Sequence, residues 1–370
     1  MSNPKILFLS NVPSPYRVDF FNELGKYCDL TVVFEKKTSD ERDESWKKYS
    51  FTNFKGVFLK GKSVSVDSAF CPGIIKFVKD KSYKEIICTN FTTPTGMLAV
   101  QYMKTHKIPY YLECDGGFPK NGKGFKERIK KHFISGAKGY FSTGKYCDDY
   151  YLAYGAERSK LIRYPFTSMY ADEISEKTST NTNRNDLREK NNIKEKYIVT
   201  SVGRFSYAQG YGKGYDILLK LAEKMETIGF YIIGDEPTEE FIHWKSSKNL
   251  YNVHFLGYKS KKELSEYYKA TDVFVLMTRG DVWGLVINEA MSYGLPVITS
   301  DKCGAGQELI KNGENGFIVP VDNISELEDR LNELLSDSNK CKAFGDKSLD
   351  IVKNYTIENM VLVHRNKMIS

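Results

Sequence analysis

The chain has 370 residues, more than one ordinary hydrophobic core supports, so we expect two domains. Its 41% hydrophobic and 27% charged residues are typical of a soluble globular protein. The net charge of +7 is unevenly divided: residues 1–170 carry 28 Lys and Arg against 17 Asp and Glu, whereas residues 171–370 carry 26 against 30. We therefore expect only the first half to meet an anionic partner.

Targeting and redox features point to the cytosol. No apolar run approaches the roughly 18 residues of a membrane span, and the N-terminus lacks the layout of a signal peptide. Seven cysteines without a CxxC pair indicate free thiols rather than a disulfide framework.

The chain opens with a strand, a helix and a strand, at residues 5–9, 18–27 and 30–34, which is the start of a parallel α/β sheet. The loop 10–17 lies at the carboxyl end of the first strand, where such sheets bind ligands. A rigid proline turn fits this loop equally well. Its candidate acceptor-side residues are Pro15, Tyr16 and Arg17.

A second strand end carries acids beside paired glycines. The strand 108–112 runs into Glu113, Cys114, Asp115, Gly116 and Gly117. This position favours a ligand site over an ordinary acidic turn.

Residues 120–145 are strongly basic, with a single acid at Glu127 and apolar residues at helical spacing. Such a helix is of the type that lies on an anionic membrane surface, although a solvated face packed on its own domain remains an alternative. Nucleic acid is discounted because no DNA- or RNA-binding motif is present. The candidate membrane-facing residues are Lys123, Lys126, Lys130 and Lys131.

The second half begins after a polar linker, residues 171–195. A strand at 197–202 leads to Arg204, and a loop with three glycines encloses Lys213 before the next helix. Glycines before a helix, with Arg and Lys beside them, suit a diphosphate. Neither the GxGxxG nor the P-loop pattern is met, so this signal is weak by itself.

The segment 279–320 reads as a loop, a helix starting near Gly284, a buried strand, a second helix and a strand. Asp281 precedes the first helix and Glu289 lies within it, roughly 12 Å away if the span is mostly helical. A helix N-terminus between two carboxylates suits a ligand with phosphate in its middle and hydroxyls at both ends, such as a nucleotide sugar.

These segments together resemble the family 4 retaining glycosyltransferases. The resemblance rests on GRF…GKGYDILLKLAE, VHFLGYKSKKELSEYYKATDVFVLMT and RGDVWGLVINEAMSYGLPVITSDKCGAGQELIKNGENGFIVP, in this order. NVPSPYRVDFFNEL and LECDGGF resemble bacterial members that build capsule and lipopolysaccharide glycans.

The resemblance implies an α/β GT-B fold, two Rossmann-like domains whose parallel sheets face a central cleft. The expected parts are an acceptor-binding domain at 1–170, the linker 171–195, a nucleotide-sugar-binding domain at 196–345, and C-terminal helices at 346–370 that cross back to the first domain.

The resemblance also implies the contacts of the donor. They are Arg204 and Lys213 on the pyrophosphate, the amides of Gly284 and Leu285 beside it, Glu289 on the ribose, Asp281 on the transferred sugar, and Gly257 and Tyr258 at the base.

Three positions depart from the family pattern. Asp281 replaces a Glu, Gln307 stands where many members have Pro, and the common His of the first domain is missing from the region of Cys114 and Asp115. We therefore infer that Asp115 orients the sugar or acceptor, and the expected catalytic set is Asp115, Arg204, Lys213 and Asp281.

The expected function is transfer of a hexose from a nucleotide sugar, with UDP preferred only by association, to a lipid-linked or growing surface polysaccharide. No metal or other cofactor is expected: DxD and HxxxH are absent, and Asp148–Asp149 is interpreted as a solvated helix face. The expected place is the inner face of the plasma membrane. The alternatives are a catalytically impaired nucleotide-binding subunit and a nucleotide-sugar epimerase.

Overall fold

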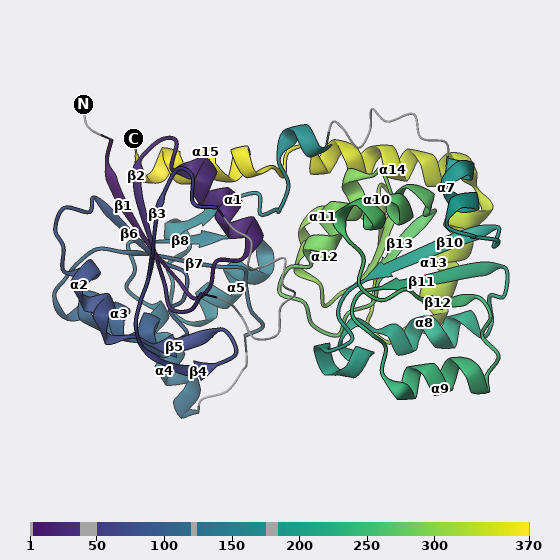
Figure 1. Cartoon of the computed structure of the whole chain (residues 1–370), viewed down its shortest axis with the longest axis horizontal. Coiled ribbons are helices and arrows are strands. Elements are labelled where there is room, and N and C mark those ends of the chain that lie inside the picture. The colour runs from purple at the N-terminus through teal and green to yellow at the C-terminus, as the bar shows by residue number, and fades with distance from the viewer. Residues whose placement is uncertain (1–2, 38–49, 120–123, 175–183, 370) are drawn as a thin grey trace. The chain divides into compact units, whose positions relative to one another are not determined.

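The computed structural model describes residues 3–37, 50–119, 124–174 and 184–369. The chain divides into two compact units (Figure 1). The first comprises Met1–Tyr170 with Tyr355–Ser370, and the second comprises Ala171–Asn354. Each unit is a parallel sheet flanked by helices. In the part of the chain that is described, no helix combines the length and the apolar character needed to cross a membrane.

The sheet of the first unit has seven strands in the order β3-β2-β1-β6-β7-β8-β9, and every pairing is parallel. The strands are β1 Lys5–Ser10, β2 Asp29–Phe34, β3 Lys55–Phe58, β6 Glu85–Cys88, β7 Tyr111–Cys114, β8 Gly139–Ser142 and β9 Leu161–Arg163. The short strands β4 Lys62–Ser65 and β5 Ser68–Phe70 form a separate antiparallel hairpin.

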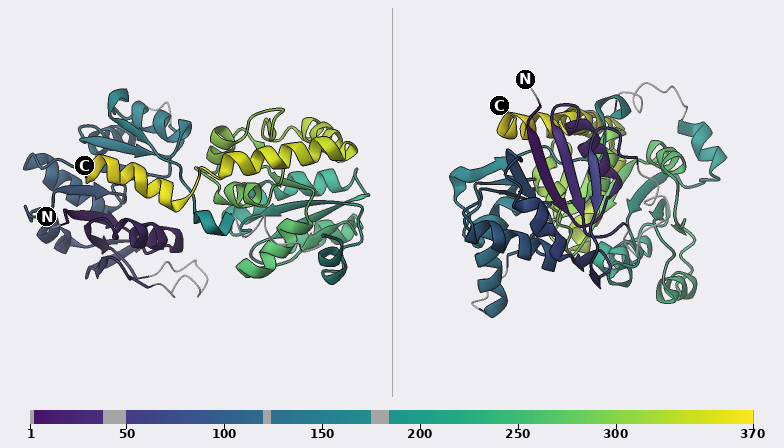
Figure 2. Two further views of the ribbon diagram at one scale, coloured as in Figure 1. Left: turned by 90° about the horizontal axis from the view of Figure 1, so that it is seen from above. Right: turned by 60° about the vertical axis from the view of Figure 1, so that its left-hand side comes forward.

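The helices of this unit cover its sheet, because its central strands are apolar and buried on both faces. They are α1 Pro15–Leu24, α2 Ile75–Val78, α3 Pro94–Thr105, α4 Phe125–Ile134, α5 Lys145–Ala153 and α15 Ile357–Met368, with 3-10 turns η2 Pro72–Ile74 and η3 Arg158–Lys160. The C-terminal α15, yellow in Figures 1 and 2, packs against α1, drawn in purple.

The helix α1 begins three residues before its predicted start. Proline is well suited to the first helical position, since its fixed φ is helical and its missing N–H is not needed there. Pro15 therefore opens the helix after Ser14. The residues predicted to form a loop, Pro15, Tyr16 and Arg17, are in fact its first turn, and Arg17 is buried.

The sheet of the second unit has six parallel strands in the order β12-β11-β10-β13-β14-β15. They are β10 Tyr197–Val202, β11 Ile228–Ile233, β12 Val253–Phe255, β13 Val273–Leu276, β14 Val297–Ser300 and β15 Gly316–Val319. The helices are α7 Arg184–Lys190, α8 Tyr215–Ala222, α9 Glu239–Ser247, α10 Lys261–Ala270, α11 Leu285–Ser292, α12 Gly304–Leu309, α13 Ile324–Ser336 and α14 Ser338–Val352, with the 3-10 segment η4 Tyr207–Lys213.

Two predicted boundaries differ from this division. The helix α7 lies inside the predicted linker, and both Arg184 and Arg188 pair with the carboxylate of Asp272, at 2.5 and 2.8 Å. The predicted crossing segment 346–370 is also divided, because α14 packs against α11 in the second unit and only α15 belongs to the first.

Candidate functional site

Two of the predicted donor-binding side chains meet in the second unit. Lys213 ends η4 just before α8, and Asp281 follows β13. The Lys213 Nζ lies 2.6 Å from Asp281 Oδ2, and the two side chains are 15% and 18% exposed. The structure thus joins a cation and a carboxylate that are 68 residues apart in the sequence.

Glycine backbones set the position of Lys213. Gly214 has a φ of 75°, and a Cβ there would lie 2.1 Å from the carbonyl oxygen of Met277. Only glycine fits this close approach without strain, so the start of α8 can lie directly against the end of β13. A Cβ on Gly203 would lie 3.2 Å from the methylene carbons of Lys213, which places the Lys213 side chain over the segment that leads to Arg204.

Arg279 ties the same two loops together. Its guanidinium donates to both carboxylate oxygens of Asp216, at 2.7 and 2.9 Å, and to the carbonyl of Tyr211. Its backbone N–H donates to Gly212 O at 2.9 Å. Hydrogen bonding to Asp216 raises the pKa of Arg279 above its ordinary value. The sequence analysis missed Arg279, and its position directly after a buried strand was the available signal.

The helix α11 begins beside the Lys213–Asp281 pair. Its N-cap, Gly284, has a φ of 96°, and a Cβ there would lie 2.9 Å from Cys303 Sγ and 3.6 Å from Asp281 Oδ2. The Asp281 carboxylate therefore lies next to the N-terminal amides of α11, which begins with Leu285. Glu289 lies within this helix as expected and accepts a hydrogen bond from Tyr268 OH at 3.2 Å.

The remaining predicted donor residues follow two other strands of this sheet, β10 and β12, which are separated by β11. Arg204 follows β10 and is half-buried, and the Asp235 carboxylate fixes the loop after it by accepting from the amides of Phe205 and Ser206. Gly257 follows β12 with a φ of 61° and accepts from Gly234 N at 3.1 Å. Tyr258 is 60% exposed.

A buried polar cluster occupies the first unit. The Arg17 guanidinium donates to Glu113 and, at 3.0 Å, to Asp115. Tyr164 OH donates to Glu113 at 3.1 Å, and Tyr16 OH lies 3.4 Å from Asp115. The structure therefore brings together Tyr16, Arg17 and Asp115 from the predicted acceptor side.

Burial and neighbouring charges shift the titration of this cluster. Burial acts to raise the pKa of Glu113, but Arg17 and His364 outweigh it and hold the value at about 2. Burial raises the pKa of Asp115, and Arg17 opposes that shift only in part. Burial together with the Asp115 carboxylate raises the pKa of Tyr16 to about 12.

Glu113 lies among the acids that were predicted to mark a ligand site, but the sequence analysis missed Tyr164 and His364, which both contact it. His364 on α15 places Nε2 3.2 Å from Glu113 Oε2 and Nδ1 2.8 Å from the carbonyl of Met360. Its ring stacks on Phe141, with centroids 4.1 Å apart. A histidine thus does lie in this unit, but it contacts Glu113 rather than Asp115. No local signal could reveal a pair that is 251 residues apart.

The two glycines after Asp115 shape the end of β7. Gly116 has a φ of 122°, and a Cβ on Gly117 would lie 2.7 Å from the Tyr150 ring. The chain thus passes close over that ring.

Asp148 is buried, and its carboxylate accepts from Ser142 Oγ and from Arg163, so its interpretation as a solvated residue is wrong.

The predicted membrane-facing lysines divide into three groups. Lys126 and Lys131 of α4 are exposed. The Lys130 side chain instead contacts residues of its own unit, with Nζ 3.3 Å from Tyr154 OH and 3.5 Å from Glu127. Lys123 lies outside the described residues. Phe125, at the start of α4, is 78% exposed.

Within the described ranges, no three His, Cys, Asp or Glu side chains are grouped so that they could hold a metal ion. Independence from metal stays a prediction.

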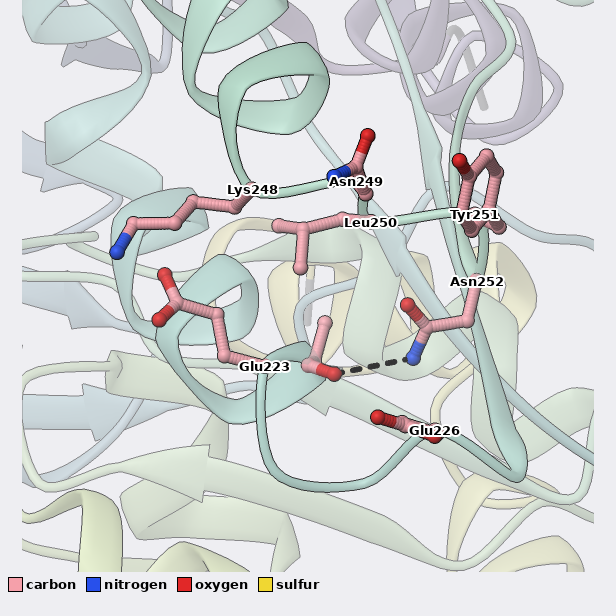
Figure 3. A pocket seen from close by; sticks show the side chains of 8 residues that line it. Glu223, Glu226, Lys248, Asn249, Leu250, Tyr251 and Asn252 are labelled. Atoms are coloured by element: carbon pink, nitrogen blue, oxygen red, sulfur yellow. Dashed lines mark hydrogen bonds between the residues drawn. The ribbon is translucent and has the colours of Figure 1, made fainter.

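A hollow of about 570 Å³ lies elsewhere on the second unit, between the end of α8 and the loop before β12 (Figure 3). Its lining includes the acid Glu223 and the base Lys248. It includes none of the predicted site residues. Asn252 fixes its floor by donating to the carbonyls of Ala222, Met225 and Ile228.

Comparison with known proteins shows what the second unit is similar to. The family model described as glycosyl transferases group 1 matches residues 183–349. That range includes η4, α11 and the Lys213–Asp281 pair, so the resemblance to glycosyltransferases is confirmed over the second unit.

Individual relatives match about half of the chain. An uncharacterized glycosyltransferase of Haemophilus influenzae is 30% identical over 193 residues, 48% of this chain and 51% of the relative. An uncharacterized 41.2 kDa protein from the cps region of Klebsiella pneumoniae is 31% identical over 176 residues, 47% of this chain and 45% of that protein. The matches thus span about half the length of these relatives.

A solved structure extends the similarity to the whole chain. Anabaena HepE in complex with UDP has a TM-score of 0.77 at 17% identity and covers 98% of both chains. At this identity the likeness shows the fold alone, and it confirms the expected GT-B fold.

Proposed function

We propose that this protein is a retaining glycosyltransferase that moves a hexose from a UDP-sugar to a lipid-linked or growing polysaccharide in surface glycan synthesis. The observation that carries the proposal is the Lys213–Asp281 pair beside the N-terminus of α11, within the region of glycosyltransferase type. The relative from a cps region supports the pathway, and the neighbour solved with UDP supports the base.

The proposed chemistry is breakage of the bond between the anomeric carbon and the diphosphate. Negative charge grows on the leaving diphosphate during this step. Lys213, Arg204 and the amides at Gly284 and Leu285 would stabilise that charge more in the transition state than in the ground state. Asp115, held by Arg17, would orient the sugar or the acceptor. Because these fixed groups stabilise the negative charge on the diphosphate, the proposed reaction needs no metal.

Lys213→Ala is expected to lower kcat by about 10²–10³-fold, the effect of removing one charge-stabilising donor in comparable sites. Glu289→Ala is expected to raise the KM for the donor, because Glu289 is assigned to the ribose. The measurement is release of UDP from UDP-sugars with a polyprenyl-linked acceptor. Glu314→Gln, an exposed acid in the same unit, is the matched control.

Binding assays separate the alternatives. Thermal shift with UDP, GDP, ADP and TDP identifies the base, because a ligand that binds only the folded state stabilises it. Binding without turnover would favour the impaired subunit, and interconversion of free nucleotide sugars would favour the epimerase. No binding of any of these nucleotides would contradict the proposal.

Turnover that survives excess EDTA is expected, and its loss would contradict metal independence.

We also place the protein on the inner face of the plasma membrane through α4. Phe125, Lys126 and Lys131 are all exposed on this helix, and a combination of apolar and basic residues binds anionic lipid surfaces. Vesicles containing phosphatidylglycerol are expected to sediment the protein, and vesicles of phosphatidylcholine are not. Lys126→Glu with Lys131→Glu is expected to abolish sedimentation, whereas Lys130→Gln has a weaker effect because Lys130 faces its own unit.

A further inference from the structure

The ion pair at the candidate donor site is well shielded from water. Lys213 Nζ and Asp281 Oδ2 are 2.6 Å apart, and less than a fifth of either side chain is exposed. Solvent and salt screen such a pair far less than a surface pair. Asp281 therefore neutralises much of the positive charge that Lys213 presents to its surroundings.

The backbone imposes this pairing. Thr278 Oγ1 and Arg279 N both donate to the carbonyl of Gly212 at 2.9 Å, which joins the two loops without using the pair itself. Asp281 is anchored separately, because its N–H donates to Lys302 O and its carbonyl accepts from Gly304 N, both at 3.0 Å.

The Lys213 side chain has little freedom to turn away. Its methylene carbons pack over Gly203, and its Nζ lies 5.6 Å from the centre of the Tyr207 ring. An anion that binds Lys213 in this position must therefore share it with the Asp281 carboxylate.

We infer that Asp281 is an internal counter-ion that competes with the diphosphate for Lys213 and so weakens the hold on a free nucleoside diphosphate after transfer. This role is separate from the contact with the transferred sugar that the resemblance implies. It rests on the proposed function, because it takes Lys213 to bind the diphosphate.

The charge of the ligand makes the effect selective. A free nucleoside diphosphate carries about one more negative charge at pH 7 than the glycosylated donor, because its terminal phosphate ionises a second time near pH 6. The Asp281 carboxylate therefore opposes the product more than the substrate. Product release limits turnover in many transferases, so such a counter-ion favours the catalytic cycle.

The test is the affinity for UDP, measured by titration calorimetry on the full chain. Asp281→Asn removes the charge and keeps one oxygen, so it retains an acceptor either for Lys213 or for the Trp283 amide, which donates to Asp281 Oδ1 at 3.3 Å. Asp281→Asn is expected to bind UDP at least about tenfold more tightly than the wild type, and its affinity for UDP-glucose is expected to rise less. Asp281→Glu, which keeps the charge, is expected to bind UDP as the wild type does.

A double-variant cycle shows whether Asp281 acts through Lys213. In a Lys213→Met background, Asp281→Asn is expected to give a smaller gain in UDP affinity than in the wild-type background. Glu314→Gln is the control, because this exposed acid of the same unit pairs with Lys347 at 3.9 Å. It is expected to leave UDP affinity unchanged.

The outcomes separate the two proposals. Wild-type binding of UDP without a gain in Asp281→Asn, or an equal gain in both backgrounds, would overturn the counter-ion role alone. Absence of nucleoside diphosphate binding in the wild type and in every variant would overturn the proposed function and this inference with it. Thermal unfolding of each variant checks that the fold is kept.

Discussion

Gly214 and Gly313 have nearly the same positive φ angle but different surroundings. Their φ angles are 75° and 79°, and a Cβ would meet Met277 O at 2.1 Å on Gly214 but nothing within 4 Å on Gly313. Gly313→Ala should therefore cost only the left-handed backbone strain, about 1 kcal/mol of the free energy of unfolding. Gly214→Ala adds a clash with backbone and should cost about 1–3 kcal/mol more.

Urea denaturation of both variants measures these costs. Gly214→Ala is also expected to weaken UDP binding, because separating α8 from β13 moves Lys213 away from the N-terminus of α11, where the diphosphate is proposed to bind. Gly313→Ala should leave UDP binding at the wild-type level. Equal costs in the two variants would contradict the role of Gly214 in holding the two loops together.

The donor-side residues were predictable because each lies beside a local signal. Lys213 stands among glycines before a helix, and Asp281 precedes a helix that begins at glycine. Their direct contact was not predicted, since it depends on which strand ends are neighbours in the sheet. His364 carries no such signal, because its contact with Glu113 is defined by tertiary packing.

At the scale of elements, α15 is joined to β7 by a buried side-chain contact between His364 and Glu113. The pKa of Glu113 is about 2, below its ordinary value of 4.5, so the folded state favours the ionised carboxylate. Its contribution is present above pH 4.5 and is lost as the pH falls from about 4.5 to 2. The shift corresponds to about 3 kcal/mol of unfolding free energy.

Glu113→Gln should show this contribution directly. The variant is expected to be less stable than the wild type at pH 7, where Arg17 and His364 lose a buried partner. The difference should shrink as the pH falls below about 4.5. Asp115 titrates in both proteins, and its pKa is expected to be lower in Glu113→Gln, because the Glu113 carboxylate is one of the groups that raise it. The exposed Glu157→Gln is the control, and a pH-independent difference for Glu113→Gln would contradict this account.

The bounds of the strands were predicted unevenly, because β7, expected at 108–112, is Tyr111–Cys114. Buried parallel strands are short apolar runs, and β10, Tyr197–Val202, has the predicted bounds. The start of α1 was misplaced because Pro15 was interpreted as part of a turn, although proline also opens helices. The division between α14 and α15 follows from which unit each helix packs on, and their amphipathic patterns do not encode that choice.

At the scale of the whole molecule, two units of similar size have separate cores. The core of the second unit includes Leu219, Phe230 and Leu331, and the core of the first includes Leu9, Ala99 and Tyr151. Chains of this kind do not need to unfold in one step. The C-terminal segment returns to the first unit, so each unit is completed by a different part of the last 33 residues, α14 for the second and α15 for the first.

A ligand confined to the second unit should therefore stabilise one unit selectively. UDP at 100 times its dissociation constant should add about 2.7 kcal/mol to the unfolding free energy of the unit that binds it. Hydrogen exchange is expected to slow in segments 203–216 and 278–289. It is also expected to slow in β10 and β13, the strands that precede these segments. Exchange in β1, β7 and α15 should change much less. Equal slowing in both units would show that the nucleotide couples their unfolding, whereas slowing confined to the first unit would contradict the placement of the donor site.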